Sequence, residues 1–106
     1  MVDIEELKPK IVEALMPLKP DKIILFGSYV YGTPNEYSDI DLFLFKKIRK
    51  EKARDAIVDA QMRVRNLVSK YKIGFDFLIA DEKYVKKRDD YFYRKDILEN
   101  GQVIYE

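Results

Sequence analysis

The sequence predicts an α/β fold with a small mixed sheet of three to four strands, helices packed on one face and an acidic cluster at the other. Two short apolar runs, residues 22–26 and 42–45, flank an irregular stretch and have the length and composition of strands. A third apolar run, residues 73–80, follows a long amphipathic segment. Strands that alternate with helical patterns are typical of a sheet covered by helices.

Length and composition limit the possible functions. The 106 residues are expected to form one domain, residues 1–106, with a modest core. A hydrophobic content of 47% with 37% charged residues is typical of a folded protein. The chain contains no cysteine and no histidine, which excludes disulfides, thiol or histidine nucleophiles and a conventional zinc site. Acid–base chemistry must therefore come from Asp, Glu, Lys or Tyr.

Charge and hydropathy indicate where the protein works. A net charge of +1 provides no general attraction to nucleic acid or to anionic membranes, so direct nucleic-acid binding is not expected. No apolar stretch approaches the roughly 18 residues of a membrane span, and the first residues lack a signal-peptide pattern. We therefore expect a cytoplasmic protein with no membrane partner.

The N-terminal segment carries an apolar stripe at helical spacing. Asp3 followed by Glu6 resembles a capping box, which marks a helix start. Because Pro9 interrupts the stripe and proline is tolerated in a first turn, we expect the regular helix to begin near Pro9 and to end at Pro17. The stripe consists of Ile4, Leu7, Ile11 and Leu15.

Two further segments have helical character. Apolar residues recur at helical spacing across residues 53–68, which predicts one amphipathic helix of about twenty residues on the sheet. The basic run at 46–52 before it is either a solvated turn or a nucleic-acid patch. Asp81 can cap a broken helix that stops at residues 100–101, before a short final strand. The three consecutive aromatics at 91–93 cannot all face one core, so part of them is a candidate partner-binding surface.

Between the first two strands lies the stretch GSYVYGTPNEYSDID, which ends in two aspartates. Residues two apart on a strand point to the same face, about 7 Å apart, so Asp39 and Asp41 project together while Ile40, Leu42 and Leu44 face the core. Two adjacent carboxylates repel each other, and a fold that keeps them together usually holds a cation. Oxygen-only ligands suit Mg²⁺ or Mn²⁺. The alternative is a solvated Ser-Asp turn at the start of a strand.

The turn that opens this stretch is a candidate anion site. Gly27 directly after a strand allows a sharp turn and the close approach of a ligand. Ser28 can cap a short helix over residues 29–32, whose N–H groups would face an anion. The alternative is a plain strand-end turn. The Gly27 and Gly32 spacing matches a Walker loop, but Thr33 stands where that motif requires lysine, which excludes a P-loop.

A third aspartate, Asp76, lies in the middle of the apolar run 73–80. With apolar residues on both faces of that run, an ionised carboxylate costs several kcal/mol unless it is paired, hydrogen-bonded or metal-bound. A cation shared with Asp39 and Asp41 would offset this cost. A salt bridge to a lysine or arginine is the alternative.

The pattern G-S-x10-D-x-D, formed by Gly27, Ser28, Asp39 and Asp41, resembles the nucleotidyltransferases related to DNA polymerase β. More closely, GSYVYGTPNEYSDIDLFLF is similar to the minimal nucleotidyltransferases of prokaryotes, the MntA-type antitoxins that pair with HEPN-domain proteins. The resemblance covers most of the chain, up to the closing segment ILENGQVIYE. It implies the polymerase β-like nucleotidyltransferase fold, and Asp76 falls where this family places its third catalytic carboxylate.

The resemblance also implies an activity: Mg²⁺-dependent transfer of a nucleoside monophosphate, AMP from ATP, to an acceptor hydroxyl, as in a protein adenylyltransferase. Asp39, Asp41 and Asp76 would be the catalytic and metal-binding residues for two Mg²⁺ ions, with Mn²⁺ a possible replacement. Gly27 and Ser28 would bind the nucleotide. The acceptor would be a tyrosine of a partner HEPN toxin in a toxin–antitoxin system.

Two other classes of function remain open from the sequence. The chain can be a non-catalytic antitoxin that neutralises its partner by contact alone, although an intact set of three aspartates argues against this. A glycosyltransferase also uses Asp-x-Asp to hold a metal–nucleotide, but its catalytic domain generally needs well over 106 residues. The tyrosines of the motif loop either stack on a base or ribose or cover the sheet edge; they are Tyr29, Tyr31 and Tyr37.

Overall fold

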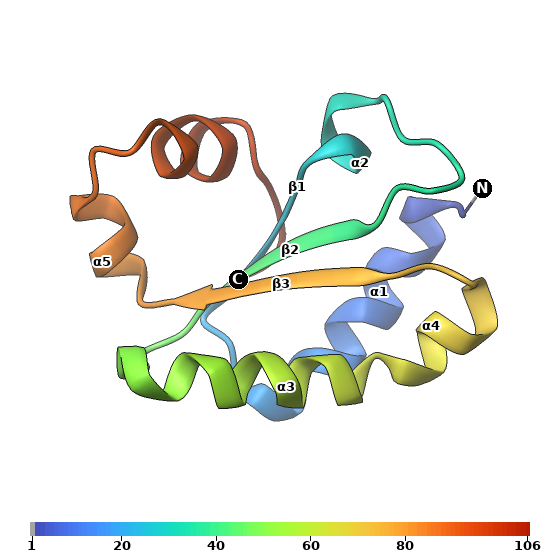
Figure 1. Cartoon of the computed structure of the whole chain (residues 1–106), viewed down its shortest axis with the longest axis horizontal. Coiled ribbons are helices and arrows are strands. Elements are labelled where there is room, and N and C mark those ends of the chain that lie inside the picture. The colour runs from blue at the N-terminus through green and yellow to red at the C-terminus, as the bar shows by residue number, and fades with distance from the viewer. Residues whose placement is uncertain (1) are drawn as a thin grey trace.

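The computed structural model describes residues 2–106, which contain a four-stranded sheet with helices on both faces (Figure 1). The order across the sheet is β3-β2-β1-β4. Strand β1 is antiparallel to both β2 and β4, whereas β2 and β3 are parallel. The predicted mixed sheet is therefore confirmed. The strands are β1 (Lys22–Phe26), β2 (Ile40–Phe45), β3 (Phe75–Ala80) and β4 (Gln102–Tyr105).

The helices divide between the two faces of the sheet. Helices α1, α3 and α4 lie on one side, and α5 and the π-helical segment η3 lie on the other (Figure 1). The helical elements are α1 (Ile4–Leu15), η1 (Met16–Leu18), α2 (Ser28–Tyr31), η2 (Lys50–Lys52), α3 (Ala53–Arg63), α4 (Arg65–Tyr71), α5 (Glu82–Lys87) and η3 (Phe92–Glu99). Within residues 2–106, no helix combines the length and apolar character that crossing a bilayer requires.

Helix α1 begins earlier than the sequence predicted. Asp3 is its N-cap, and the Asp3 carboxylate accepts a hydrogen bond of 3.0 Å from the Glu5 N–H. Pro9 lies inside the helix, so the expectation that the helix begins near Pro9 was wrong. Proline removes one backbone hydrogen bond, but the buried stripe of Leu7, Ile11 and Leu15 outweighs that loss by packing the whole helix on the sheet.

The predicted long helix is also divided, because α3 ends and α4 begins on either side of Val64. Val64 leaves helical geometry, with φ −97° and ψ 3°, while its side chain is fully buried. A straight helix of this length would measure about 28 Å, whereas a six-residue strand spans only about 20 Å. The break lets Leu67 and Val68 of α4 still pack against the core instead of extending past the sheet.

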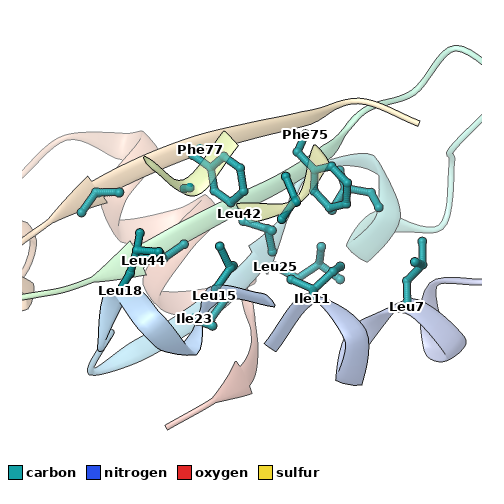
Figure 2. Packing of buried hydrophobic residues seen from close by; sticks show 14 of the residues in the cluster. Leu7, Ile11, Leu15, Leu18, Ile23, Leu25, Leu42, Leu44, Phe75 and Phe77 are labelled. Carbon is teal, nitrogen blue, oxygen red and sulfur yellow. The ribbon is translucent and has the colours of Figure 1, made fainter. Parts of the chain in front are cut away.

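The main core lies between the sheet and the α1, α3 and α4 layer. Figure 2 shows side chains of α1 meeting side chains of β1, β2 and β3 in one continuous cluster. As predicted, Ile40, Leu42 and Leu44 of β2 are fully buried in this core. Because side chains alternate along a strand, Asp41 must lie on the opposite face.

That opposite face carries a smaller core at one end only. Phe43 and Phe45 of β2 pack there with Ile24, Val85 and Ile97, so α5 and η3 form a second helical layer that the sequence did not predict. Asp41 shares this face with Phe43 and Phe45 but lies nearer the start of β2. The acidic residues therefore occupy the end of the face that lies beyond this apolar cluster.

The three consecutive aromatics separate as expected. Phe92 and Tyr93 pack against the smaller core, while Tyr91 is 73% exposed. The predicted final strand and the cap by Asp81 are also confirmed, since β4 pairs with β1 and the Asp81 carboxylate accepts a hydrogen bond from the Lys83 N–H.

Candidate active site

The centre of the site is a pair of aspartates on neighbouring strands. Asp41 of β2 and Asp76 of β3 are direct partners in the parallel register. Neighbouring strands lie about 4.8 Å apart, and residues in register point to the same face. The hydrogen-bonded ladder between β2 and β3 therefore fixes two carboxylates side by side.

Asp76 is more open to solvent than the sequence indicated. Along β3, Phe75 and Phe77 are buried whereas Asp76 and Leu78 are exposed. The expectation of apolar surroundings on both faces was wrong, because β3 is an edge strand whose second face is left uncovered around Asp76. None of the ion pairs formed within residues 2–106 involves Asp76, which removes the salt-bridge alternative.

Asp39 lies next to this pair, one residue before β2. Its carboxylate packs on Gly74, since a Cβ atom added to that glycine would lie 2.6 Å from Asp39 Oδ1. The Ile40 N–H donates to the Gly74 carbonyl at 2.9 Å, which ties the start of β2 to the approach to β3. Sequence reasoning missed Gly74, although a glycine beside an apolar strand is a known sign of close approach.

The electrostatic strain of the cluster is concentrated on Asp41. Burial of the Asp41 carboxyl, followed by the negative charges of Asp76 and Asp39, raises the pKa of Asp41 from 3.8 to about 6. A side-chain hydrogen bond with Asp76 acts in the same direction. The desolvation cost that the sequence assigned to Asp76 is therefore borne by Asp41.

The three aspartates are neighbours but not a preformed cage. Within residues 2–106, no three acidic side chains converge closely enough to form a metal-binding group. The donor chemistry nevertheless fits a hard divalent cation, because the available donors are carboxylate oxygens, and burial together with like charges raises the pKa of Asp41. Asp41 and Asp76 form the close pair, and Asp39 contributes its charge from the side.

A glycine turn closes over this pair from β1. Gly27 has φ +80° and ψ −155°, a conformation that favours glycine. A Cβ atom at this position would overlap Asp41 Oδ2. The Asp41 carboxylate therefore lies directly on the Gly27 backbone, and both conformation and space require glycine there.

Ser28 occupies a different position from the one predicted. It is the first residue of α2, and Gly27 is the N-cap, so the expectation that the Ser28 side chain caps the helix was wrong. The Gly27 carbonyl accepts hydrogen bonds from Val30 and Tyr31. By helix geometry, the N–H groups of Ser28 and Tyr29 have no acceptor inside α2. The turn thus presents two backbone donors and a hydroxyl beside the acidic pair.

Comparison with known proteins agrees with this arrangement. The family described as "Nucleotidyltransferase domain" matches residues 5–104. The chain belongs to this nucleotidyltransferase family. The predicted resemblance to the nucleotidyltransferases is confirmed.

Two relatives come from Methanocaldococcus jannaschii. "Putative protein adenylyltransferase MJ0604" is 31% identical over 84 residues, which cover 79% of this chain and 77% of the relative. "Putative protein adenylyltransferase MJ0141" is 34% identical over 84 residues, which cover 78% of this chain and 77% of the relative. The chain is therefore an enzyme of the nucleotidyltransferase class whose curated relatives are named for protein adenylylation.

Two solved structures share the fold. A toxin–antitoxin crystallised with AMP-PNP superimposes with a TM-score of 0.61 at 20% identity, over 92% of this chain and 72% of that chain. A mutant of the toxin–antitoxin MntA-HpeT gives a TM-score of 0.60 at 18% identity, with the same coverage of both chains.

The tyrosines of the nucleotidyltransferase motif loop have three different environments. Tyr29 packs against the main core, and burial together with the charge of Asp39 raises its pKa. The Tyr31 hydroxyl donates to Asp96 at 2.8 Å, which links α2 to η3. Tyr37 is 86% exposed. Tyr29 and Tyr31 thus have structural contacts, and Tyr37 is the most exposed of the three.

The surroundings of the acidic pair define its walls. Phe26, the partner of Asp41 in the antiparallel register, packs edge-on against Phe92 with ring centroids 5.6 Å apart. A cavity of about 550 Å³ is lined by residues of α1, α4 and the motif loop, and Asp39, Asp41 and Asp76 are not among its lining residues. Aromatic side chains therefore border the pair on the side of β1.

Replacing Gly27 with alanine tests the contact with Asp41. Gly32 provides a partial control, because it has the same φ of +80° but open space where a Cβ atom would lie. Alanine costs about 1–2 kcal/mol in the left-handed conformation of Gly32, and more at the ψ of −155° of Gly27, so the loss at Gly27 combines backbone strain with the overlap on Asp41. We expect Gly27→Ala to lower the free energy of unfolding by clearly more than Gly32→Ala, as measured by urea denaturation. Equal losses would mean that Asp41 moves aside without cost.

The raised pKa of Asp41 predicts a pH-dependent stability. The folded protein holds the Asp41 proton more tightly than the unfolded chain does, so this contribution is present below about pH 4 and is lost as the pH rises to about 6. Because the side chain is only partly buried, solvent screening limits the change to about 1–2 kcal/mol. Asp41→Asn should therefore gain stability relative to the wild type across this interval. A constant difference from pH 4 to 7 in urea unfolding experiments would contradict it.

Proposed function

We propose that this nucleotidyltransferase transfers AMP from ATP to a hydroxyl group of a protein, and that the acceptor is a tyrosine of a partner HEPN-domain toxin. The observation that carries the proposal is the Asp41–Asp76 pair in register beside the Gly27 turn. The relatives named as protein adenylyltransferases support the reaction. The shared fold of a toxin–antitoxin crystallised with AMP-PNP, an ATP analogue, supports the nucleotide and the type of partner.

The turn after β1 supplies the proposed phosphate grip. The N–H groups of Ser28 and Tyr29 and the Ser28 hydroxyl would donate hydrogen bonds to the β- and γ-phosphates of ATP. Gly27 has no side chain that would keep a phosphate away from this backbone. The turn thereby holds the triphosphate against the acidic pair and orients the α-phosphorus towards Asp76.

The aspartates are the proposed metal ligands. Asp39, Asp41 and Asp76 would hold two Mg²⁺ ions, or Mn²⁺ in their place. Bound divalent ions would neutralise the charge of the triphosphate and of the attacking and leaving oxygens. The protein contributes the rigid β2–β3 ladder, which keeps the carboxylates in place before substrate binds.

The exposure of Asp76 supports a role on the acceptor side. In the transfer step the acceptor oxygen forms a bond to the α-phosphorus, the bond from that phosphorus to its bridging oxygen breaks, and pyrophosphate leaves. The proton of the acceptor hydroxyl passes to the Asp76 carboxylate, which solvent and a large acceptor can reach. Asp41, held against the Gly27 backbone, would serve to hold the metal.

The electrostatic cost of the site favours catalysis over neutralisation by contact alone. A surface that only binds a partner has no need to keep Asp41 at a pKa of about 6 beside two other acidic side chains. A carboxyl group with a pKa raised in this way is typical of sites that bind a cation or transfer a proton.

The transfer reaction tests the proposal. Wild-type chain, Mg²⁺ and ATP labelled on the α-phosphate should place label on the HEPN-domain protein with which the chain co-purifies. Asp41→Asn should lower this transfer by about 100-fold or more, because one metal ligand is lost, while circular dichroism shows an intact fold. Asp55→Asn, at an exposed position on α3, is the matched control and should keep wild-type transfer.

Two results would overturn this assignment. Near-wild-type turnover of Asp41→Asn in Mg²⁺ would remove Asp41 from the reaction. Neutralisation of the partner toxin without any label on it would favour the non-catalytic antitoxin.

A further inference from the structure

Strand β3 forms one border of the sheet and has a hydrogen-bonding edge that faces outward. In the described residues β3 pairs with β2 alone (Figure 1). The Ile40 N–H donates to the Gly74 carbonyl, and the Lys46 N–H donates to the Ala80 carbonyl. In a parallel ladder, every second residue of a strand directs its backbone groups to the same side. The carbonyls of Asp76 and Leu78 therefore point towards β2 as well.

The backbone groups of the intervening residues therefore point away from the sheet. Gln61 of α3 confirms the direction, because its side-chain amide donates to the Phe75 carbonyl at 2.7 Å. Beyond this contact, the N–H and carbonyl groups of Phe77 and Ile79 remain on the outer edge. They form a short template on which another strand can pair.

The two edges of the sheet are protected to different degrees. At the opposite border, β4 is only four residues long, and its pairing with β1 is interrupted by a register shift between Ile23 and Ile24. Strand β3 is six residues long, pairs in continuous register and contains neither proline nor lysine. Proteins usually protect exposed edges by a short strand, a register irregularity, proline or lysine. The edge of β3 has none of these and is suited to binding.

A basic stripe runs beside this edge on helices α3 and α4. Arg54, Val58 and Gln61 are spaced by three or four residues and so lie on one side of α3, and Arg65 begins α4 directly after the break at Val64. Because Gln61 reaches the β3 edge, this stripe borders it. Val58 is 55% exposed. A strand added to β3 would therefore meet two arginines and an exposed apolar side chain on its α3 side.

On its other face the same edge leads from the acidic pair to an apolar hollow. Leu78, two residues after Asp76, is 40% exposed. Two residues further, Ala80 lines a cavity of about 420 Å³ together with Tyr84 and Tyr93. Asp76, Leu78 and Ala80 point to one face and span about 13 Å. An extended segment on this edge would have one side chain at Asp76 and another, four positions away, at the cavity.

We propose that the acceptor docks by adding an extended strand to the β3 edge, with its hydroxyl-bearing residue at Asp76, an apolar residue four positions away at the cavity, and acidic residues facing the arginines of α3 and α4. This inference rests on the proposed transferase function and names the type of acceptor segment. Main-chain hydrogen bonds would supply affinity, and the alternate side chains would supply specificity.

Charge complementarity selects an acidic partner over a second copy of this chain. If two β3 edges paired with each other, the Arg54 and Arg65 stripes of both copies would lie on the same eight-stranded assembly without acidic counterparts in the stripe. Like charges brought together at an interface oppose association. An acidic strand would instead place negative charges beside these arginines, which favours association.

The probe is a synthetic peptide, Glu-Tyr-Glu-Val-Glu-Phe-Glu, in which tyrosine and phenylalanine are four positions apart. Titration followed by NMR should show binding with the largest amide shifts at Phe77 and Ile79. Arg54→Glu combined with Arg65→Glu should weaken binding by about tenfold or more. Arg63→Glu, on the other side of α3 where Arg63 pairs with Asp59, is the matched control and should change it by less than about twofold.

Two N-methylated peptides separate strand addition from side-chain contact alone. One carries N-methyl groups at Tyr, Val and Phe, and the other at the three glutamates between and after them. Since alternate N–H groups of a strand point to opposite edges, one of these peptides should lose binding and the other should keep it. Equal binding by both, no binding by the parent peptide, or a dimer of the chain that uses the β3 edge would each overturn the inference.

Failure of this inference is distinguishable from failure of the proposed function. If AMP transfer to the partner protein is unaffected by the Arg54→Glu and Arg65→Glu changes, the docking edge is wrong while the transferase function stands. If no acceptor receives AMP although the peptide binds at β3, the transferase function itself is wrong.

Discussion

The repulsion between the Asp41 and Asp76 carboxylates is the constraint on which the rest of the structure depends. The parallel ladder of β2 and β3 places the two side chains next to each other, and the burial of Leu42 and Phe77 on the opposite face prevents either strand from turning to separate them. Burial of the Asp41 carboxyl, followed by the charges of Asp76 and Asp39, raises the pKa of Asp41, so the repulsion accounts for part of this shift. The β2–β3 ladder and the large apolar core together hold the charges in place, which is the arrangement expected of the proposed cation and triphosphate site.

The residues that pack against the carboxylates are glycines, whose lack of a side chain leaves room for the carboxylate oxygens. Gly27 and Gly74 approach Asp41 and Asp39 so closely that any side chain at either position would collide with a carboxylate oxygen. Gly27 follows the end of β1, and Gly74 precedes the start of β3. The site is therefore assembled by the sheet and not by one loop. This explains why so short a chain can carry it: β1, β2 and β3 each contribute one wall, and α2 adds its donors.

Alternation and spacing in the sequence were sufficient to predict the strands and the side on which Asp41 lies. They predicted less well wherever a distant part of the chain decides the outcome. The burial of α1 overrides Pro9, the length of the sheet divides the long helix at Val64, and the edge position of β3 exposes Asp76. Ser28 is not a cap because Gly27 takes that position with a positive φ. In each case the sequence encodes a local conformational preference, and packing against the rest of the fold decides whether the chain adopts it.

The most direct test of the central claim is a comparison of thermal unfolding for the wild type and Asp76→Asn, each with and without Mg²⁺ and ATP. If the aspartates repel one another in the metal-free protein, Asp76→Asn should melt at a higher temperature than the wild type. For the wild type, Mg²⁺ and ATP at about 100 times the dissociation constant should add roughly 2.7 kcal/mol, a shift on the order of 10 °C or more. The shift should be smaller for Asp76→Asn. A metal-free Asp76→Asn protein that is less stable than the wild type and keeps the full ligand shift would contradict the three-aspartate site.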